Sequence, residues 1–160
     1  MDSKLLDILA ANAHASKDDI ARQLNSTVEI VTERIAALEA DGIILGYQAI
    51  LDEERANSKN VTAVIEVRIT PERGGGFDRL AGRISQFEQV ASCYLMSGGY
   101  DLAVVVEGGD LREIAMFVTE KLSTIEGVLS TATSFRLKTY KSNGILARTE
   151  VSSGRLSVAP

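Results

Sequence analysis

Residues 97–101, Ser-Gly-Gly-Tyr-Asp, join two strand-like apolar runs and combine residue types that could bind a small ligand. Two adjacent glycines permit backbone conformations that residues with a Cβ avoid, so this string predicts a turn between two strands. A turn alone needs neither an aromatic ring nor a carboxylate. Backbone N–H groups, the Asp101 carboxylate and the Tyr100 ring could instead hold a small polar molecule. The alternative is that Asp101 caps the turn and Tyr100 packs on a sheet edge.

The rest of the composition supplies little catalytic chemistry. His14 is the only histidine and Cys93 the only cysteine, which disfavours a metal site and excludes an intrachain disulfide. No apolar run, Leu102–Val106 included, is long enough to span a bilayer. Asp2 and Asp7 interrupt the N-terminal apolar residues where a signal peptide would need them. We therefore expect a cytoplasmic protein with no catalytic residues, no cofactor and no membrane partner.

The elements that must position residues 97–101 follow from the apolar pattern. In residues 1–40, apolar side chains recur at helical spacing in three stretches. Ser16 and Thr27 are suited to cap the second and third helices, and Gly42 suits the left-handed position that ends the third. Residues 43–51 are apolar and predict a strand. This order predicts a winged helix-turn-helix, with a three-helix bundle unrelated to nucleic acid as the alternative.

The second half of the chain predicts a different domain. Strands are expected at residues 61–69, 90–96, 102–106 and 128–140, and helices at residues 77–87 and 111–122, with breaks at Pro71 and Gly74–Gly76. The order β-α-β-β-α-β predicts a ferredoxin-like domain, so the whole chain is of the α+β class. Val64 lies on the opposite side of the first strand from its apolar neighbours, which predicts that a second copy covers the open sheet face.

Composition sets the expected boundaries. Residues 52–60 are polar and charged and are expected to be a linker. The expected domains are residues 1–51 (winged helix-turn-helix), residues 61–140 (ferredoxin-like) and a polar tail of residues 141–160. The tail has a short apolar patch at residues 145–147, and is expected either to be mobile or to add an edge strand.

These parts and several strings resemble the Lrp/AsnC family of bacterial and archaeal transcription regulators. The resemblance covers roughly residues 2–140 and rests on Asp2–Leu6 with Leu9, Asp19–Ala21 with Leu24, Val31, Arg34–Ile35, Leu38–Glu39, Gly42–Tyr47, Leu51–Asp52 and Ser97–Asp101. It implies a DNA-binding regulator that responds to an effector, typically an amino acid. It also implies a homodimer formed through the second domains, often gathered into an octameric ring, with the effector bound between dimers.

The resemblance places the effector at the Gly98–Asp101 loop, and the chemistry of that loop agrees. Asp101 can pair with an α-ammonium group, and N–H groups at Gly98 and Gly99 can bind a carboxylate. Thr131 and Thr133 on the last strand could add hydroxyls from a neighbouring chain, or be ordinary strand residues. The expected effector-binding residues are Gly98, Gly99, Tyr100, Asp101, Thr131 and Thr133.

Charge complicates the DNA-binding prediction. The net charge is −5, and the third expected helix, residues 28–40, carries three glutamates and one base, Arg34. DNA-binding surfaces normally rely on Lys and Arg to contact phosphates. DNA binding then either depends on multivalency in an oligomer or has been lost, which would leave an oligomeric small-molecule-binding protein. The candidate DNA contacts are Lys17, Arg22, Thr27, Thr32 and Arg34.

An enzyme is a third, disfavoured hypothesis. Some sirohaem decarboxylases share this two-domain plan, but their chemistry would be expected to use histidines. This chain has only His14. The sequence therefore predicts a regulator with no catalytic or metal site.

Overall fold

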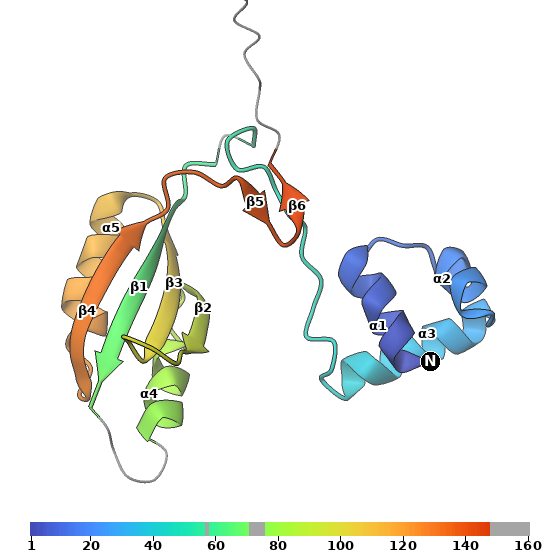
Figure 1. The fold of residues 1–160 in the computed structure, drawn as a ribbon, viewed down its shortest axis with the longest axis horizontal. Coiled ribbons are helices and arrows are strands. Elements are labelled where there is room, and N and C mark those ends of the chain that lie inside the picture. The colour runs from blue at the N-terminus through green and yellow to red at the C-terminus, as the bar shows by residue number, and fades with distance from the viewer. Residues whose placement is uncertain (57, 71–75, 148–160) are drawn as a thin grey trace, which may run out of the picture. The chain divides into compact units, whose positions relative to one another are not determined.

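The computed structural model describes residues 1–56, 58–70 and 76–147. It divides the chain into a first compact unit, Met1–Leu51, and a second that begins at Asp52 (Figure 1). Pro71, Gly74, Gly75 and the tail beyond residue 147 lie outside the described residues, so the breaks expected there and the fate of that part of the tail stay predictions.

The first unit contains the three expected helices. They are α1 (Asp2–Ala11), α2 (Lys17–Leu24) and α3 (Val28–Ala40). Both expected caps form: the Ser16 side chain accepts a hydrogen bond from the Asp19 N–H, and Thr27 accepts one from the Ile30 N–H. Apolar residues from all three helices make one core, namely Leu5, Leu9, Ile20, Ala21, Val31 and Leu38. The helix-turn-helix is therefore confirmed.

The strand expected at residues 43–51 is wrong. Gly42 (φ +68°) ends α3, and the N–H groups of Ile43 and Ile44 both bond to the Leu38 carbonyl, at 2.9 and 3.1 Å. Beyond them the chain is irregular, and Leu45 is 94% exposed. An apolar run indicates strand propensity, but a strand also needs a hydrogen-bonded partner. The described first unit contains helices and no strand that could pair with this segment.

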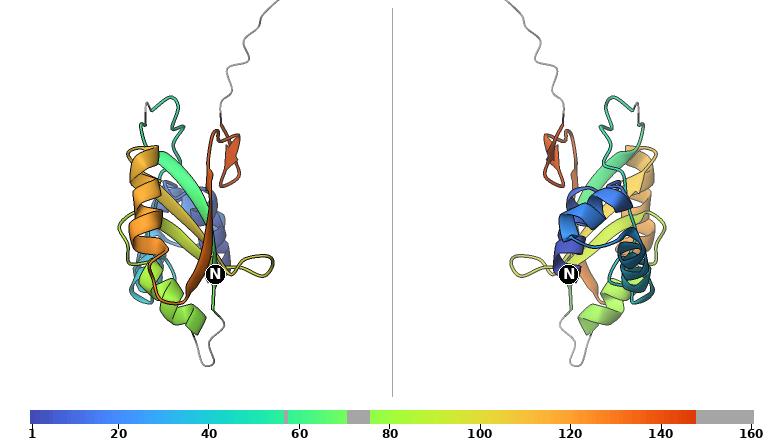
Figure 2. Two further views of the ribbon diagram at one scale, coloured as in Figure 1. Left: turned by 90° about the vertical axis from the view of Figure 1, so that its left-hand side faces the viewer. Right: turned by 90° about the vertical axis from the view of Figure 1, so that its right-hand side faces the viewer.

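The second unit has the predicted βαββαβ order. Its elements are β1 (Val61–Ile69), α4 (Gly76–Ile84), β2 (Val90–Leu95), β3 (Leu102–Gly108), α5 (Leu111–Met116), the π-helical η1 (Phe117–Leu122), β4 (Val128–Phe135), β5 (Lys141–Ser142) and β6 (Ile145–Leu146). The main sheet is antiparallel with strand order β2-β3-β1-β4. Figures 1 and 2 show α4 and α5 on the same face of this sheet.

Alternation along β1 divides the sheet into two faces. Ala63, Ile65, Val67 and Ile69 are buried and pack with residues of β3, α4, α5 and η1. Full burial of a side chain of this kind contributes about 1.5–3 kcal/mol to folding. The other face of β1 is mixed: Val64 is 37% exposed, and Glu66 and Arg68 are exposed.

The last strand and the tail differ from expectation. β4 ends at Phe135 rather than residue 140, because its partner β1 begins at Val61 and the Arg136 N–H already bonds to the Thr62 carbonyl at 2.9 Å. Residues 141–146 add no edge strand to the sheet; they pair with each other as the β5–β6 hairpin. The start of the expected linker is bound to the segment that follows β4. Arg136 Nη2 donates to both carboxylate oxygens of Glu53, at 2.7 and 2.6 Å.

Candidate functional site

The connection between β2 and β3 is a six-residue loop, Met96–Asp101, rather than a tight two-residue turn. Leu95 pairs with Leu102, and the Met96 N–H donates to the Asp101 carbonyl at 2.8 Å, which closes the base of the loop. Gly98 has φ +148°, a conformation that residues with a Cβ rarely adopt. No atom lies within 4 Å of where its Cβ would stand, so the backbone rather than the available space requires glycine.

Asp101 fixes this loop to β1. Its N–H donates to the Val67 carbonyl at 3.0 Å, and its Oδ2 accepts a hydrogen bond from the Ile69 N–H at 2.8 Å. The Asp101 side chain thus bonds to a neighbouring strand, whereas the alternative drawn from the sequence had it cap its own turn. The described residues give the other oxygen, Oδ1, no hydrogen-bond partner. One carboxylate oxygen can therefore anchor the loop while the second stays available to a ligand.

The remaining expected effector residues lie around this loop in two groups. Gly98 and Gly99 are exposed and Tyr100 is half-buried, and Figure 2 shows the loop projecting from the sheet on the side opposite the helices. Thr131 pairs with Val67 and Thr133 with Ile65, so both half-buried threonines lie on the helix-covered face. The Thr131 Oγ1 is 3.3 Å from the Ser123 Oγ. Within one chain, the threonine side chains and the projecting loop are on opposite faces.

On α3, the expected DNA contact Arg34 is bound to α1. Its Nε donates to Asp2 Oδ1 at 2.7 Å, and its Nη2 donates to Asp2 Oδ2. These hydrogen bonds lower the pKa of the Asp2 carboxyl from its ordinary value, and raise the pKa of Arg34. The pair holds the first turn of α1 against α3.

The other four candidate DNA contacts are spread over α2 and α3. Arg22 pairs with Asp19 within α2, and Lys17 is exposed at the start of that helix. Thr27 caps α3, with its Oγ1 3.4 Å from the Ile30 nitrogen, and Thr32 is half-buried. Both arginine candidates are therefore engaged with carboxylates of the first unit.

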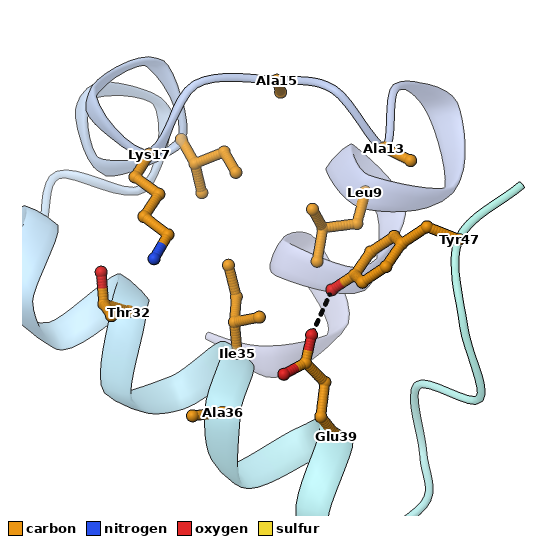
Figure 3. Close-up of a pocket in the computed structure, with 10 residues that line it drawn as sticks. Leu9, Ala13, Ala15, Lys17, Thr32, Ile35, Ala36, Glu39 and Tyr47 are labelled. Carbon is orange, nitrogen blue, oxygen red and sulfur yellow. Dashed lines mark hydrogen bonds between the residues drawn. The ribbon is translucent and has the colours of Figure 1, made fainter. Parts of the chain in front are cut away.

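A pocket of about 280 Å³ lies beside these residues in the first unit. In Figure 3, Lys17 and Thr32 point toward one side of it, and on the other side the Tyr47 hydroxyl donates to Glu39 Oε1 at 2.9 Å. Burial, with a smaller contribution from this hydrogen bond, raises the pKa of Tyr47. Sequence reasoning missed this contact, because nothing in the local pattern pairs two side chains eight residues apart. It fastens the segment after α3 to the helix.

Neither a metal site nor a membrane span emerges from the part of the chain that the structure describes. Its residues contain no group of three or more His, Cys, Asp or Glu side chains placed to hold a metal ion. None of its helices is both long and apolar enough to cross a membrane.

Comparison with known sequences matches both units. A model of the winged helix-turn-helix DNA-binding domain matches residues 1–44, and one of the Lrp/AsnC ligand binding domain matches residues 62–146. The HTH-type transcriptional regulator YugG of Bacillus subtilis is 41% identical over 99% of this chain and 96% of its own length. The proline dehydrogenase transcriptional activator of Rhodobacter capsulatus is 32% identical over 82% of this chain and 84% of its own. These relatives are named as regulators, not as enzymes.

Solved structures agree with the sequences. A Neisseria meningitidis transcriptional regulator in complex with L-Met superposes with a TM-score of 0.66 and 25% identity, covering 87% of this chain and 89% of that one. An AsnC family regulator from Agrobacterium tumefaciens gives a TM-score of 0.67 and 26% identity, covering 91% and 94%. The two-domain architecture is thus shared over nearly the full length of both chains.

Proposed function

The chain belongs to the Lrp/AsnC family of DNA-binding transcriptional regulators, and we propose that it senses an amino acid through the loop Met96–Asp101. The observation that carries this proposal is that the two oxygens of the Asp101 carboxylate differ in their hydrogen bonding. One oxygen binds the Ile69 N–H, and the other has no hydrogen-bond partner in the described residues. A free carboxylate oxygen beside exposed glycine N–H groups suits a zwitterion.

The chemistry of the loop matches an α-amino acid in each part. The free oxygen of Asp101 would accept from the α-ammonium group, and a charge-assisted hydrogen bond is about twice as strong as a neutral one. The N–H groups of Gly98 and Gly99 would donate to the α-carboxylate. Tyr100 would supply an apolar wall for the side chain of the ligand. The L-Met complex of the Neisseria relative supports this class of ligand.

We also propose that two chains assemble through the open sheet face, and that dimers can gather into a larger ring. Val64 stands near the middle of that face and is only partly exposed in one chain. Thr131 and Thr133 lie on the helix-covered face, so they would reach an effector only across a separate contact between dimers. As a DNA-binding regulator of this family, the protein would work in the cytoplasm, together with the chromosome.

A two-stage binding experiment tests the effector proposal. The twenty amino acids are screened by thermal shift, and the best hit is added to an electrophoretic retardation assay at low salt on DNA from the protein's own upstream region. We expect at least one amino acid to raise the melting temperature and to change the DNA affinity. If no amino acid does either, the effector is of another class. If the protein binds the amino acid but no DNA, it is the oligomeric binding protein of the alternative hypothesis.

A further inference from the structure

The recognition helix α3 carries a single base, and that base is paired with a carboxylate of the first unit. Arg34 is the only Lys or Arg in Val28–Ala40, and one edge of its guanidinium, Nε and Nη2, donates to the Asp2 carboxylate. Arg and Lys are the usual partners of guanine in the major groove, through its O6 and N7 atoms. Because this ion pair holds the guanidinium toward α1, the other exposed side chains of α3 are additional candidates for base contacts.

The solvent-exposed surface of α3 presents an apolar side chain next to a carboxylate. Val31 and Leu38 are buried, and Val28 and Ile35 pack against the same core. On the remaining surface, Ile30 is 48% exposed and Glu33 is exposed. These two residues are three apart, so their side chains are neighbours on the helix surface. Ile30 is not part of the buried core of the first unit, and it lies in the region that matches a DNA-binding domain.

A second glutamate on this helix has a different environment. Glu29, at the N-terminus of α3, accepts hydrogen bonds from its own backbone N–H and from the Thr27 hydroxyl, which lower its pKa. Its carboxylate therefore stabilises the start of the helix. Glu33 lies one turn later, and no hydrogen bond or ion pair to it is found among residues 1–51. Glu29 is thus a matched control for Glu33, with the same charge on the same helix.

The major groove offers a fitting partner for each exposed side chain. An ionised carboxylate only accepts hydrogen bonds, and the cytosine N4 amino group is the donor that Glu contacts there. An apolar side chain contacts the C5-methyl group of thymine. We propose that Glu33 and Ile30 are the base-reading residues of α3, selecting cytosine and thymine respectively.

This proposal rests on DNA binding by the first unit, and selection from a random duplex library tests it. The full-length protein and its Ile30→Ala, Glu33→Gln and Glu29→Gln variants are compared at low salt. We expect a wild-type consensus with thymine and cytosine in each half-site. Glu33→Gln should lose the cytosine preference, about fivefold or more in affinity. Glu29→Gln should strengthen binding to all sequences and keep the consensus.

Modified bases test the contacts atom by atom. Replacing the consensus thymine by deoxyuridine removes only the methyl group, and should weaken wild-type binding about fourfold while leaving Ile30→Ala unaffected. Leu45→Ala removes another exposed apolar side chain of the first unit. This variant should lose as much affinity as the wild type when deoxyuridine replaces thymine. An unchanged consensus and an unchanged deoxyuridine effect in the Ile30 and Glu33 variants would overturn the proposal. Specific binding without these preferences would overturn it and leave DNA binding standing; no binding at all would overturn both.

Discussion

Asp101 illustrates how one side chain can serve both the fold and the ligand. Its anchoring bond to Ile69 lies between residues 32 positions apart, so no local pattern reports it. The sequence could predict that a carboxylate ends the Gly-Gly turn, because that combination of residue types is visible in the string. It could not predict that one oxygen is used by β1, because that depends on which strand lies beside β3.

The first prediction separates these two roles of Asp101. Asp101→Asn keeps an oxygen that can accept from the Ile69 N–H but removes the charge that would pair with an α-ammonium group. It should unfold at nearly the wild-type temperature and bind the best amino acid about 30-fold to several thousand-fold more weakly, as for a truncated charge pair. Asp101→Ala should also lose stability, because a partly buried N–H is left without its acceptor. Calorimetric titration and thermal unfolding measure both effects. Wild-type affinity in the Asn variant would remove the carboxylate from the site.

The second prediction concerns the ion pair of Asp2 and Arg34. Since the folded pKa of Asp2 is lowered, its contribution to stability is fully present above the ordinary carboxyl pKa of 3.8 and is lost as the pH falls through the lowered value. The stability difference between wild type and Asp2→Asn should therefore be present near neutral pH and decrease once the pH falls below 3.8. Thermal unfolding of both proteins at low salt, from about pH 7 to about pH 3, measures it. A difference that persists unchanged at the acid end would show that the pair is not its source.

At the scale of elements, the sequence predicted the features that depend on neighbouring residues along the chain. Three helices, two of their caps and the βαββαβ order of elements along the chain follow from apolar periodicity and capping residues. The errors occur where the formation or the length of a strand depends on a hydrogen-bonded partner strand. Residues 43–51 have strand propensity and no partner. β4 cannot extend to residue 140, because only Thr62 and Val61 of β1 lie beyond the pairing of Ala63 with Phe135. The division of the second helix into α5 and η1 has no counterpart in the apolar pattern, which continues through both.

The third prediction tests the conformation of the loop Met96–Asp101. Gly98→Ala forces a Cβ into a backbone conformation with φ +148°, which should cost about 1–3 kcal/mol and disturb amino-acid binding. Gly99→Ala is the matched control, because Gly99 has no such φ and open space around its missing Cβ. Chemical denaturation of both variants gives the free energies of unfolding. Equal losses in the two would mean that the strain at Gly98 is relieved at little cost.

At the scale of the whole molecule, the open face of the sheet determines the fourth prediction. Val64→Glu places a charge near the middle of the face proposed to meet a second copy, and should reduce the assembly to monomers. Leu111→Glu is the control: Leu111 is 56% exposed at the start of α5, in the helix layer. Light scattering at micromolar concentration should find at least a dimer for wild type and for the control. A wild-type monomer would refute the proposed assembly.

Two contacts make the connection between the units shorter than its composition suggests. Tyr47 is bonded to Glu39 in the first unit, and Glu53 to Arg136 in the second, so only residues 48–52 lie between these fixed points. A fully extended chain covers about 3.3–3.6 Å per residue, so Tyr47 and Glu53 can be no more than about 20 Å apart. In a dimer, the two short connections would limit the distance between the DNA half-sites that the protein can bind. Inserting glycines and serines within residues 48–52 should therefore broaden the range of half-site spacings that it accepts. Electrophoretic retardation assays on DNA with a series of spacings would measure this range. The same insertion between Asn143 and Gly144, in the β5–β6 turn, should leave the accepted spacing as it was.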